Sequence, residues 1–343
     1  MEEPIGIVGA GITGLATAYV LSPKYSITIV ARELPGDLGT NWASPWYLSF
    51  LLDILHKTDL ESRAGAVFHP QIKATKTQQE MQKRSFKFYW DLAHQDPSSG
   101  VKIYPMTEYF DDRNNDSDIW YKTLMPDYRI IAKSELPEGV SMGVKYTALA
   151  MSPLLLLPWL KKKLEERGVK FVRKEVKSLD EVQKITSAKI IVNASGVGAK
   201  ELASDDAVHP VRGQTMFVKT DLNELFMREG SEYTYIIPRV GSGGVIMGGI
   251  KSDRLDAEVD VELKSDILRR VNHMTKGAFD GLDLESVVDL VGFRPGRTTG
   301  LRVEKEGDVI HAYGAEGAGY IYSFGVAVKV KELIEGSGLR AKL

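Results

Sequence analysis

The sequence predicts an α/β fold in which a sheet with flanking helices is joined to a second, mostly antiparallel sheet. Three observations carry this prediction. The chain opens with a buried strand at 5–8, a glycine-rich turn at 9–14 and an apolar helix at 15–21. A second strand-like run follows at 26–30. Further along, β-branched stretches between 210 and 249 predict the strands of the second sheet.

The glycine-rich turn reads Gly9-Ala10-Gly11-Ile12-Thr13-Gly14, the G-x-G-x-x-G pattern of Rossmann-like dinucleotide-binding domains. In this pattern Gly9 allows the tight turn, Gly11 lets the backbone approach a pyrophosphate, and Gly14 lets helix and strand pack closely. The following helix offers unpaired N–H groups and a partial positive charge to phosphates. Because the turn stands between a strand and a helix, it predicts a dinucleotide site.

The residues after the second strand leave the type of dinucleotide open. The strand runs into Ala31-Arg32-Glu33, and Glu33 lies about twenty residues beyond Gly14, where a carboxylate that holds ribose hydroxyls is expected. Arg32 beside it is equally suited to the 2′-phosphate of a nicotinamide cofactor. These residues alone therefore allow either cofactor class.

Composition and charge exclude several classes of protein. A chain of 343 residues favours two domains, and 43% hydrophobic with 26% charged residues is typical of a globular protein. The net charge of −2 argues against a nucleic-acid partner. With no cysteine there is no disulfide or thiolate metal site, and the six histidines lack metal-site spacing, so no metal is expected.

No membrane span or signal peptide is expected. The apolar stretch Thr147–Leu160 is too short to cross a bilayer and contains Pro153 and Pro158. Ser152 instead predicts an N-cap, with Pro153 at the first position of a helix that ends at Gly168.

Several further segments, in order along the chain, resemble the D-amino acid oxidase family, which includes D-aspartate oxidases. They are Ala43-Ser44-Pro45-Trp46, 191–199, 210–214, 235–238, 292–297 and 311–320. The resemblance covers residue 6 to about 329 and implies FAD as cofactor. The places of the flavin motifs then predict a discontinuous FAD-binding domain and an α+β substrate domain. The first comprises 1–50, 145–200 and 286–343, and the second 51–144 and 201–285.

The resemblance also implies which residues contact FAD. They are Gly9, Gly11, Ile12, Thr13, Gly14, Ala31, Arg32, Glu33, Thr40, Asn41, Val176, Ser195, Gly196, Arg294, Gly317, Ala318, Gly319, Tyr320 and Ile321. Fungal members are the most similar in the Ala-Ser-Pro-Trp segment. The final Ala341-Lys342-Leu343 is a close variant of the Ser-Lys-Leu signal, which predicts a peroxisomal import receptor as partner and the peroxisome as location.

The same resemblance implies an active site. Arg294 would grip the substrate's α-carboxylate, since a guanidinium forms a planar fork that matches it. Tyr235 would donate a hydrogen bond to the same group, and the backbone carbonyl of Gly317 would meet the amine. The reaction implied is oxidative deamination of a D-amino acid. Hydride transfer from Cα to flavin N5 would yield a 2-oxo acid, ammonia and hydrogen peroxide without a side-chain base.

Two basic residues predict an acidic substrate, D-aspartate or D-glutamate. Arg228 matches an arginine of D-aspartate oxidases, and Lys251 stands where those enzymes place a second arginine. Because Lys251 is a point charge and not a fork, Arg254 or Arg239 is an alternative contact. Two cations would favour a second carboxylate and penalise an apolar side chain.

Three alternatives stay open from sequence. The first is an oxidase of neutral D-amino acids, or a relative acting on glycine or N-methylated amino acids. The second is a nicotinamide-dependent dehydrogenase, motivated by Arg32. The third is a flavin-binding protein without activity. The oligomeric state is also open, with a homodimer as one option.

Overall fold

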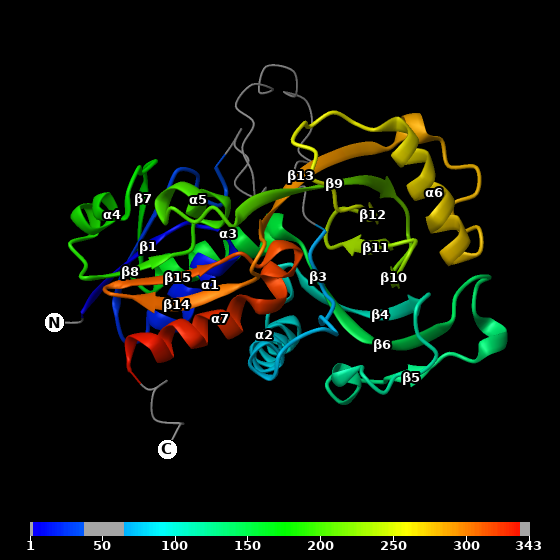
Figure 1. The fold of residues 1–343 in the computed structure, drawn as a ribbon, viewed down its shortest axis with the longest axis horizontal. Helices are drawn as coiled ribbons and strands as arrows, with labels where there is room; N and C mark the ends of the chain where they lie inside the picture. Colours follow the sequence, from blue (N-terminus) through cyan, green and yellow to red (C-terminus); the bar gives the residue numbers. More distant parts are fainter. Residues whose placement is uncertain (1–2, 38–64, 337–343) are drawn as a thin grey trace.

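The computed structural model describes residues 3–37 and 65–336, and two sheets organise it (Figure 1). The first sheet has six strands in the order β14-β15-β8-β1-β2-β7. Its strands are β1 (Pro4–Val8), β2 (Ser26–Ala31), β7 (Lys170–Arg173), β8 (Ile190–Asn193), β14 (Arg302–Glu306) and β15 (Val309–Tyr313). Five of them are parallel, and β14 pairs antiparallel with β15 at one edge. This is the predicted Rossmann-like sheet.

The second sheet has nine strands in all, with the order β13-β9-β12-β11-β10-β4-β6-β3 and β5 paired to β6. Its strands are β3 (Val67–Phe68), β4 (Val101–Phe110), β5 (Arg129–Ile130), β6 (Met142–Met151), β9 (Val208–Lys219), β10 (Leu225–Glu229), β11 (Thr234–Arg239), β12 (Gly244–Gly248) and β13 (Val288–Arg297). Every pairing is antiparallel except that of β10 with β4. The prediction of a mostly antiparallel second sheet is confirmed.

The helices cover the two sheets unequally. They are α1 (Ile12–Leu21), α2 (Lys76–Gln95), α3 (Pro153–Glu166), α4 (Leu179–Thr186), α5 (Ala199–Leu202), α6 (Val261–Thr275) and α7 (Gly319–Ile334). Figure 1 shows α1 and α7 against the six-stranded sheet and α6 beside the outer part of the nine-stranded one. Ser152 precedes α3 with Pro153 at its first position, as predicted, although its side chain makes no capping hydrogen bond.

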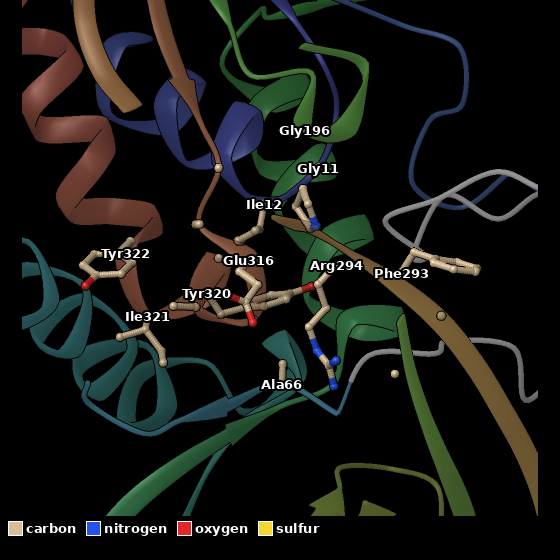
Figure 2. Close-up of a pocket in the computed structure, with 18 of the residues that line it drawn as sticks. Gly11, Ile12, Ala66, Gly196, Phe293, Arg294, Glu316, Tyr320, Ile321 and Tyr322 are labelled. Atoms are coloured by element: carbon tan, nitrogen blue, oxygen red, sulfur yellow. The ribbon is translucent and has the colours of Figure 1, made fainter. Parts of the chain in front are cut away.

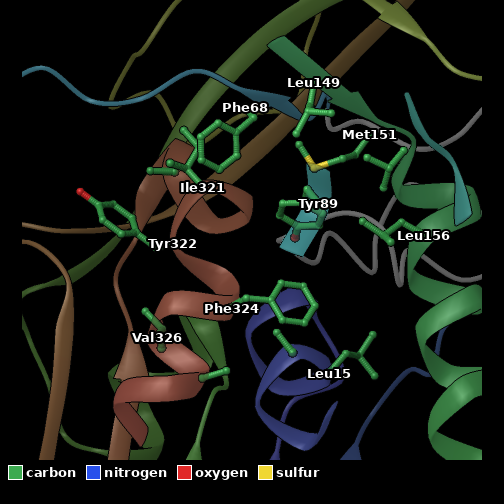
Figure 3. Close-up of a cluster of buried hydrophobic side chains, with 14 of the residues drawn as sticks. Leu15, Phe68, Tyr89, Leu149, Met151, Leu156, Ile321, Tyr322, Phe324 and Val326 are labelled. Carbon is green, nitrogen blue, oxygen red and sulfur yellow. The ribbon is translucent and has the colours of Figure 1, made fainter. Parts of the chain in front are cut away.

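The main core lies where α1, α2, α3 and α7 meet. Figure 3 shows Leu15, Tyr89, Leu156 and Phe324 converging there from these four helices. Helices α2 and α7 approach closely at Gly325, where a Cβ would collide with the backbone of Met81. Burying these apolar side chains stabilises the site, because it fixes the two halves of the molecule against one core.

Two predicted domain boundaries differ from the sheets. Residues 145–151 were expected in the FAD-binding domain but belong to β6, and residues 288–297 belong to β13, both in the nine-stranded sheet. Conversely, α2 was expected in the substrate domain, yet it packs on α7. The boundaries were misplaced because the flavin motifs lie at the ends of strands, and these strands continue from one half of the molecule into the other. Figure 1 shows β9 and β13 running from one half into the other.

Candidate active site

A cavity of about 1610 Å³ opens between the two sheets, and both contribute to its wall. The six-stranded half supplies the glycine turn after β1, the end of β2 and the segment before α7. The nine-stranded half supplies side chains of β10, β11 and β13. Figure 2 shows Gly11 and Ile12 on one side of this space, with Tyr320 and the side chain of Arg294 extending into it. The cavity therefore brings the predicted cofactor and substrate residues together.

The three glycines of the turn occupy three different environments. Gly9 has φ of +105°, where a side chain is strained, and a Cβ there would collide with the backbone of Ala194. A Cβ on Gly14 would collide with the carbonyl of Gly9, so Gly14 permits the close approach of α1. Gly11 has nothing within 4 Å of a Cβ position and lines the cavity.

The rest of the expected cofactor wall is assembled in the same cavity. Ala31, Arg32 and Glu33 line it at the end of β2, and burial raises the pKa of the Glu33 carboxyl. The guanidinium of Arg32 lies 3.8 Å from the carboxylate of Glu33 and 3.9 Å from that of Glu175. The remaining described residues of the predicted set that line the cavity are Gly9, Gly11, Ile12, Thr13, Val176, Ser195, Gly196, Arg294, Gly317, Ala318, Gly319, Tyr320 and Ile321. Thr40 and Asn41 lie outside the described residues, as do Ala43–Trp46 and Ala341-Lys342-Leu343.

Arg294 and Tyr235 meet in the substrate half of the cavity. Strand β13 carries Arg294, whose Nη2 lies 3.4 Å from the hydroxyl of Tyr235 on β11. Its Nη1 donates to the backbone carbonyl of Ile250 at 3.2 Å. No carboxylate pairs with this guanidinium among the described residues. The geometry thus presents a planar cation and a phenol to the same space.

Neighbouring glycines make room for these two side chains. A Cβ on Gly213 would lie 2.6 Å from Nη1 of Arg294, and a Cβ on Gly248 would lie 2.5 Å from the ring of Tyr235. Both distances are far inside van der Waals contact. The positions of Arg294 and Tyr235 therefore depend on glycine at 213 in β9 and at 248 in β12.

The segment before α7 places Gly317 next to the arginine. A Cβ on Gly317 would lie 3.5 Å from Cδ of Arg294. The preceding Glu316 has φ of +50°, which is uncommon for a residue with a side chain. Its carboxylate forms an ion pair of 2.8 Å with Lys251, and both residues line the cavity. Lys251 is thus present at the site, as predicted, but its charge is matched.

Arg228 is not where the acidic-substrate prediction requires it. Its side chain is 5% exposed and binds Asp111 at 2.9 Å and Glu232 at 2.8 Å, and it does not line the cavity. The cause is strand register. Met227 pairs with Tyr235 and faces the cavity with it, so the next residue, Arg228, faces the opposite side of the sheet. The expected contact of Arg228 with a substrate has no geometric support.

The alternative cations are also occupied elsewhere. Arg254 is exposed and binds Asp256 and Asp260, each at 2.9 Å. Arg239 is buried beside the ring of Phe217, and burial lowers its pKa to about 10. Neither lines the cavity. Arg297, three residues beyond Arg294, forms an ion pair of 2.8 Å with Asp205.

Two groups that sequence reasoning missed face the cavity. His69 lines it, and its Nε2 lies 2.6 Å from Oε1 of the fully buried Glu108. Glu229 lines it two residues beyond Met227, on the same face of β10. Strand alternation would have identified Glu229 once Tyr235 was assigned to the site. His69 lies in a short strand-and-turn region without a sequence motif, so no signal marked it.

No group of three or more histidine, aspartate or glutamate side chains suited to a metal ion occurs in residues 3–37 and 65–336. Over the same ranges, every helix is too short or too polar to traverse a bilayer.

The chain belongs to the DAO family of FAD dependent oxidoreductases, whose model matches residues 5–333. A D-amino-acid oxidase of Fusarium vanettenii is 28% identical and covers 100% of this chain and 99% of the relative. A D-aspartate oxidase of Talaromyces thermophilus is 30% identical, covering 97% and 95%. The L-proline dehydrogenase from P. horikoshii shares the fold, with a TM-score of 0.74 at 14% identity over 99% of this chain and 95% of that structure.

FAD fits the residues present. The open space at Gly11, with the N-terminus of α1 behind it, suits a pyrophosphate, because the first N–H groups of a helix have no partner within it. The partly buried Glu33 carboxylate suits ribose hydroxyls. A 2′-phosphate at Arg32 would meet Glu33 and Glu175 as well. The protein is therefore an FAD-dependent oxidoreductase, and the nicotinamide alternative is set aside.

Proposed function

We propose that this protein catalyses FAD-dependent oxidative deamination of D-amino acids, with oxygen as the final electron acceptor. The reaction converts the amino acid, oxygen and water into a 2-oxo acid, ammonia and hydrogen peroxide. The observation that carries the proposal is the pair of Arg294 and Tyr235, which lies in the same cavity as the glycine turn. The relatives from Fusarium vanettenii and Talaromyces thermophilus are named as oxidases of D-amino acids and D-aspartate.

The chain's own residues bind and orient the substrate. Arg294 offers two parallel N–H donors to the α-carboxylate, and Tyr235 donates its hydroxyl proton to the same group. The backbone carbonyl of Gly317, beside Arg294, accepts from the substrate's amine. Held at both groups, the substrate has its Cα–H bond fixed in direction. When bound, FAD would supply the acceptor for the Cα hydrogen and its two electrons, with oxygen as the terminal oxidant.

Preference for acidic substrates is a second candidate, favoured by one observation. Lys251 lines the cavity, and its side chain is 51% exposed, so its ammonium group has room to turn toward a substrate. A dicarboxylic amino acid would have to displace Glu316 from this ammonium group. The gain in Coulomb energy would be partly offset by the lost ion pair. Turnover of D-aspartate relative to D-alanine measures this preference.

The purified protein tests the proposal by its absorption spectrum and by peroxide release. We expect flavin bands, and peroxide from D-amino acids but not from their L-forms. A flavin spectrum that does not bleach anaerobically with any amino acid would leave a binding protein without activity. Peroxide from glycine or N-methylated amino acids exceeding that from every D-amino acid would shift the substrate class within the family.

The cellular location is part of the same proposal. Ala341-Lys342-Leu343 supports import into peroxisomes, where hydrogen peroxide is contained. A fluorescent protein carrying the last ten residues should enter peroxisomes, and the same fusion lacking these three residues should stay in the cytosol. Equal distribution of the two fusions would remove the location from the proposal.

A further inference from the structure

A buried polar network stands behind the substrate half of the cavity. Glu108 accepts hydrogen bonds from Tyr121 at 2.8 Å and Tyr146 at 2.9 Å, in addition to its contact with Nε2 of His69. An ionised carboxylate can only accept hydrogen bonds, so the Nε2 atom of His69 must carry the proton that it donates to Glu108. The other ring nitrogen, Nδ1, then faces Glu229, whose Oε1 lies 3.9 Å away.

Glu229 has no hydrogen-bonded partner for its carboxylate within residues 3–37 and 65–336. The 3.9 Å separation from Nδ1 of His69 is too long for a hydrogen bond. Burial raises the pKa of Glu229, and the charges of His69 and Lys251 work in the opposite direction. In the neutral form of His69 both Nδ1 and the carboxylate are acceptors. Two acceptors side by side in a cavity wall are complementary to a donor on the ligand.

The other charges around this part of the cavity are matched. Lys251 pairs with Glu316, and Arg294 is matched by the α-carboxylate once a substrate binds. His69, even when protonated, is balanced by Glu108. Among the described groups near Arg294 and Tyr235, which together form the anchor for the α-carboxylate, Glu229 then carries the charge that has no partner. An ammonium or guanidinium group would pair with it, whereas a second carboxylate would be repelled.

Glu229 also lies at a suitable place relative to the anchor. Met227 is directly opposite Tyr235 across the β10–β11 pairing, and Glu229 follows on the same face. Tyr233 also lines the cavity, and the centroid of its ring lies 5.7 Å from that of Tyr235. A substrate whose α-carboxylate is held at Arg294 can therefore direct its side chain along this strand toward Glu229.

We infer that Glu229 is a specificity-determining residue that binds a cationic side chain, so that basic D-amino acids such as D-lysine and D-arginine are preferred over dicarboxylic ones. The inference rests on the proposed D-amino acid oxidation and opposes its acidic-substrate candidate. Glu108, which accepts from Tyr121 and Tyr146, holds the ring of His69 in the cavity wall beside Glu229.

The test compares two substrates of matched shape in the purified holoenzyme. D-Lysine and D-norleucine differ by the terminal ammonium group, and D-aspartate represents the acidic class. We expect kcat/KM for D-lysine to exceed that for the other two by about tenfold or more. In Glu229→Gln the value for D-lysine should fall about 10–100-fold, while that for D-norleucine changes less than about twofold. Glu262→Gln, an exposed carboxylate on α6, is the control and should change neither.

Each other outcome has a distinct meaning. Equal losses for D-lysine and D-norleucine in Glu229→Gln would overturn the inference, because they indicate packing and not charge. Wild-type preference for D-aspartate over D-lysine would overturn it in favour of the acidic candidate, and the proposed function would stand. If no D-amino acid yields peroxide, the proposed function falls and the inference falls with it.

Discussion

The two walls of the cavity are made from different parts of the chain. On the side of the six-stranded sheet, the wall includes the backbone of the glycine turn, in which Gly9 and Gly14 are required by close approaches and Gly11 lies open to the cavity. On the side of the nine-stranded sheet it is made of side chains, among them Arg294, Tyr235 and Glu229, which come from three strands. A backbone wall is specified by a local motif, whereas a side-chain wall depends on how strands pair.

This difference predicts how each wall responds to substitution. A change in the first wall should alter flavin binding for every substrate alike. A change in the second wall should leave the flavin bound and alter turnover. At the anchor, Arg294 with Tyr235, turnover of all substrates should change, whereas at Glu229, where the substrate side chain would end, turnover of one substrate class should change.

The anchor should be the most sensitive position. Arg294→Lys replaces a planar fork with a point charge, and we expect kcat/KM to fall about 10³-fold for every D-amino acid. Flavin content should be unchanged. Arg297→Lys is the matched control, since Arg297 pairs with Asp205 away from the anchor, and it should lose little activity. A loss for one substrate class only would show that Arg294 does not hold the common carboxylate.

The space that holds the anchor should matter next. In Gly213→Ala the added methyl would lie 2.6 Å from Nη1 of Arg294, so the guanidinium must shift. Because that guanidinium is the far end of a flexible side chain, the fold should survive with Tm nearly unchanged. We expect kcat/KM to fall about 10–100-fold, since misplacement of a positioning group by about 1 Å has this effect. Unchanged turnover would show that the substrate does not need this position of Arg294.

Arg228 should affect stability and not specificity. Arg228→Met removes a buried cation from Asp111 and Glu232. Glu232 keeps its ion pair with Arg269, whereas Asp111 loses its ion pair, which should cost about 3 kcal/mol of unfolding free energy. Denaturant unfolding of the holoenzyme measures this. The ratio of kcat/KM for D-aspartate to that for D-alanine should stay the same. A selective loss of D-aspartate turnover would restore the role expected from sequence.

As the pH falls, the attraction of Glu229 for a cationic side chain should weaken before the binding of the α-carboxylate by Arg294 does. Burial raises the pKa of Glu229, so its carboxylate takes up a proton at a higher pH than an ordinary glutamate and then no longer attracts a cation. The ratio of kcat/KM for D-lysine to D-norleucine should therefore fall as pH decreases through that raised pKa. Glu108, His69, Lys251 and Asp112 also act on this carboxylate. Glu229→Gln should make the ratio independent of pH over the same range.

Lys251 should have the smallest effect. Because Glu316 already pairs with its ammonium group, Lys251→Ala should reduce D-aspartate turnover by less than about threefold. A loss of tenfold or more confined to D-aspartate would mean about 1–3 kcal/mol from a charge-assisted bond and would support the acidic candidate. Equal losses for neutral and acidic substrates would remove Lys251 from substrate recognition altogether.

The sequence predicted one wall better than the other for a physical reason. The roles expected for Gly9, Gly11 and Gly14 follow from a turn of six residues, and β11 lies within the region 210–249 where strands were expected. Arg228 was misplaced because a strand alternates faces, and a match of residue type does not say which face is inward.

The domain boundaries and the pairing of charges in the cavity could not be predicted from local sequence, because both depend on contacts between distant segments. Helix α2 packs on α7 across 240 residues, as in the hydrogen bond between Gly325 and Ser85. The pairing of Lys251 with Glu316 joins segments that no local pattern links.

Arg294 is proposed to hold the α-carboxylate of a D-amino acid and so to direct its Cα–H bond toward the bound flavin. Anaerobic mixing of the holoenzyme with D-alanine or L-alanine, followed by flavin absorbance, tests it most directly. We predict bleaching by D-alanine alone in the wild type, and at least about 10³-fold slower bleaching in Arg294→Lys with the same flavin content. Equally fast bleaching in the variant, or bleaching by L-alanine, would contradict the account.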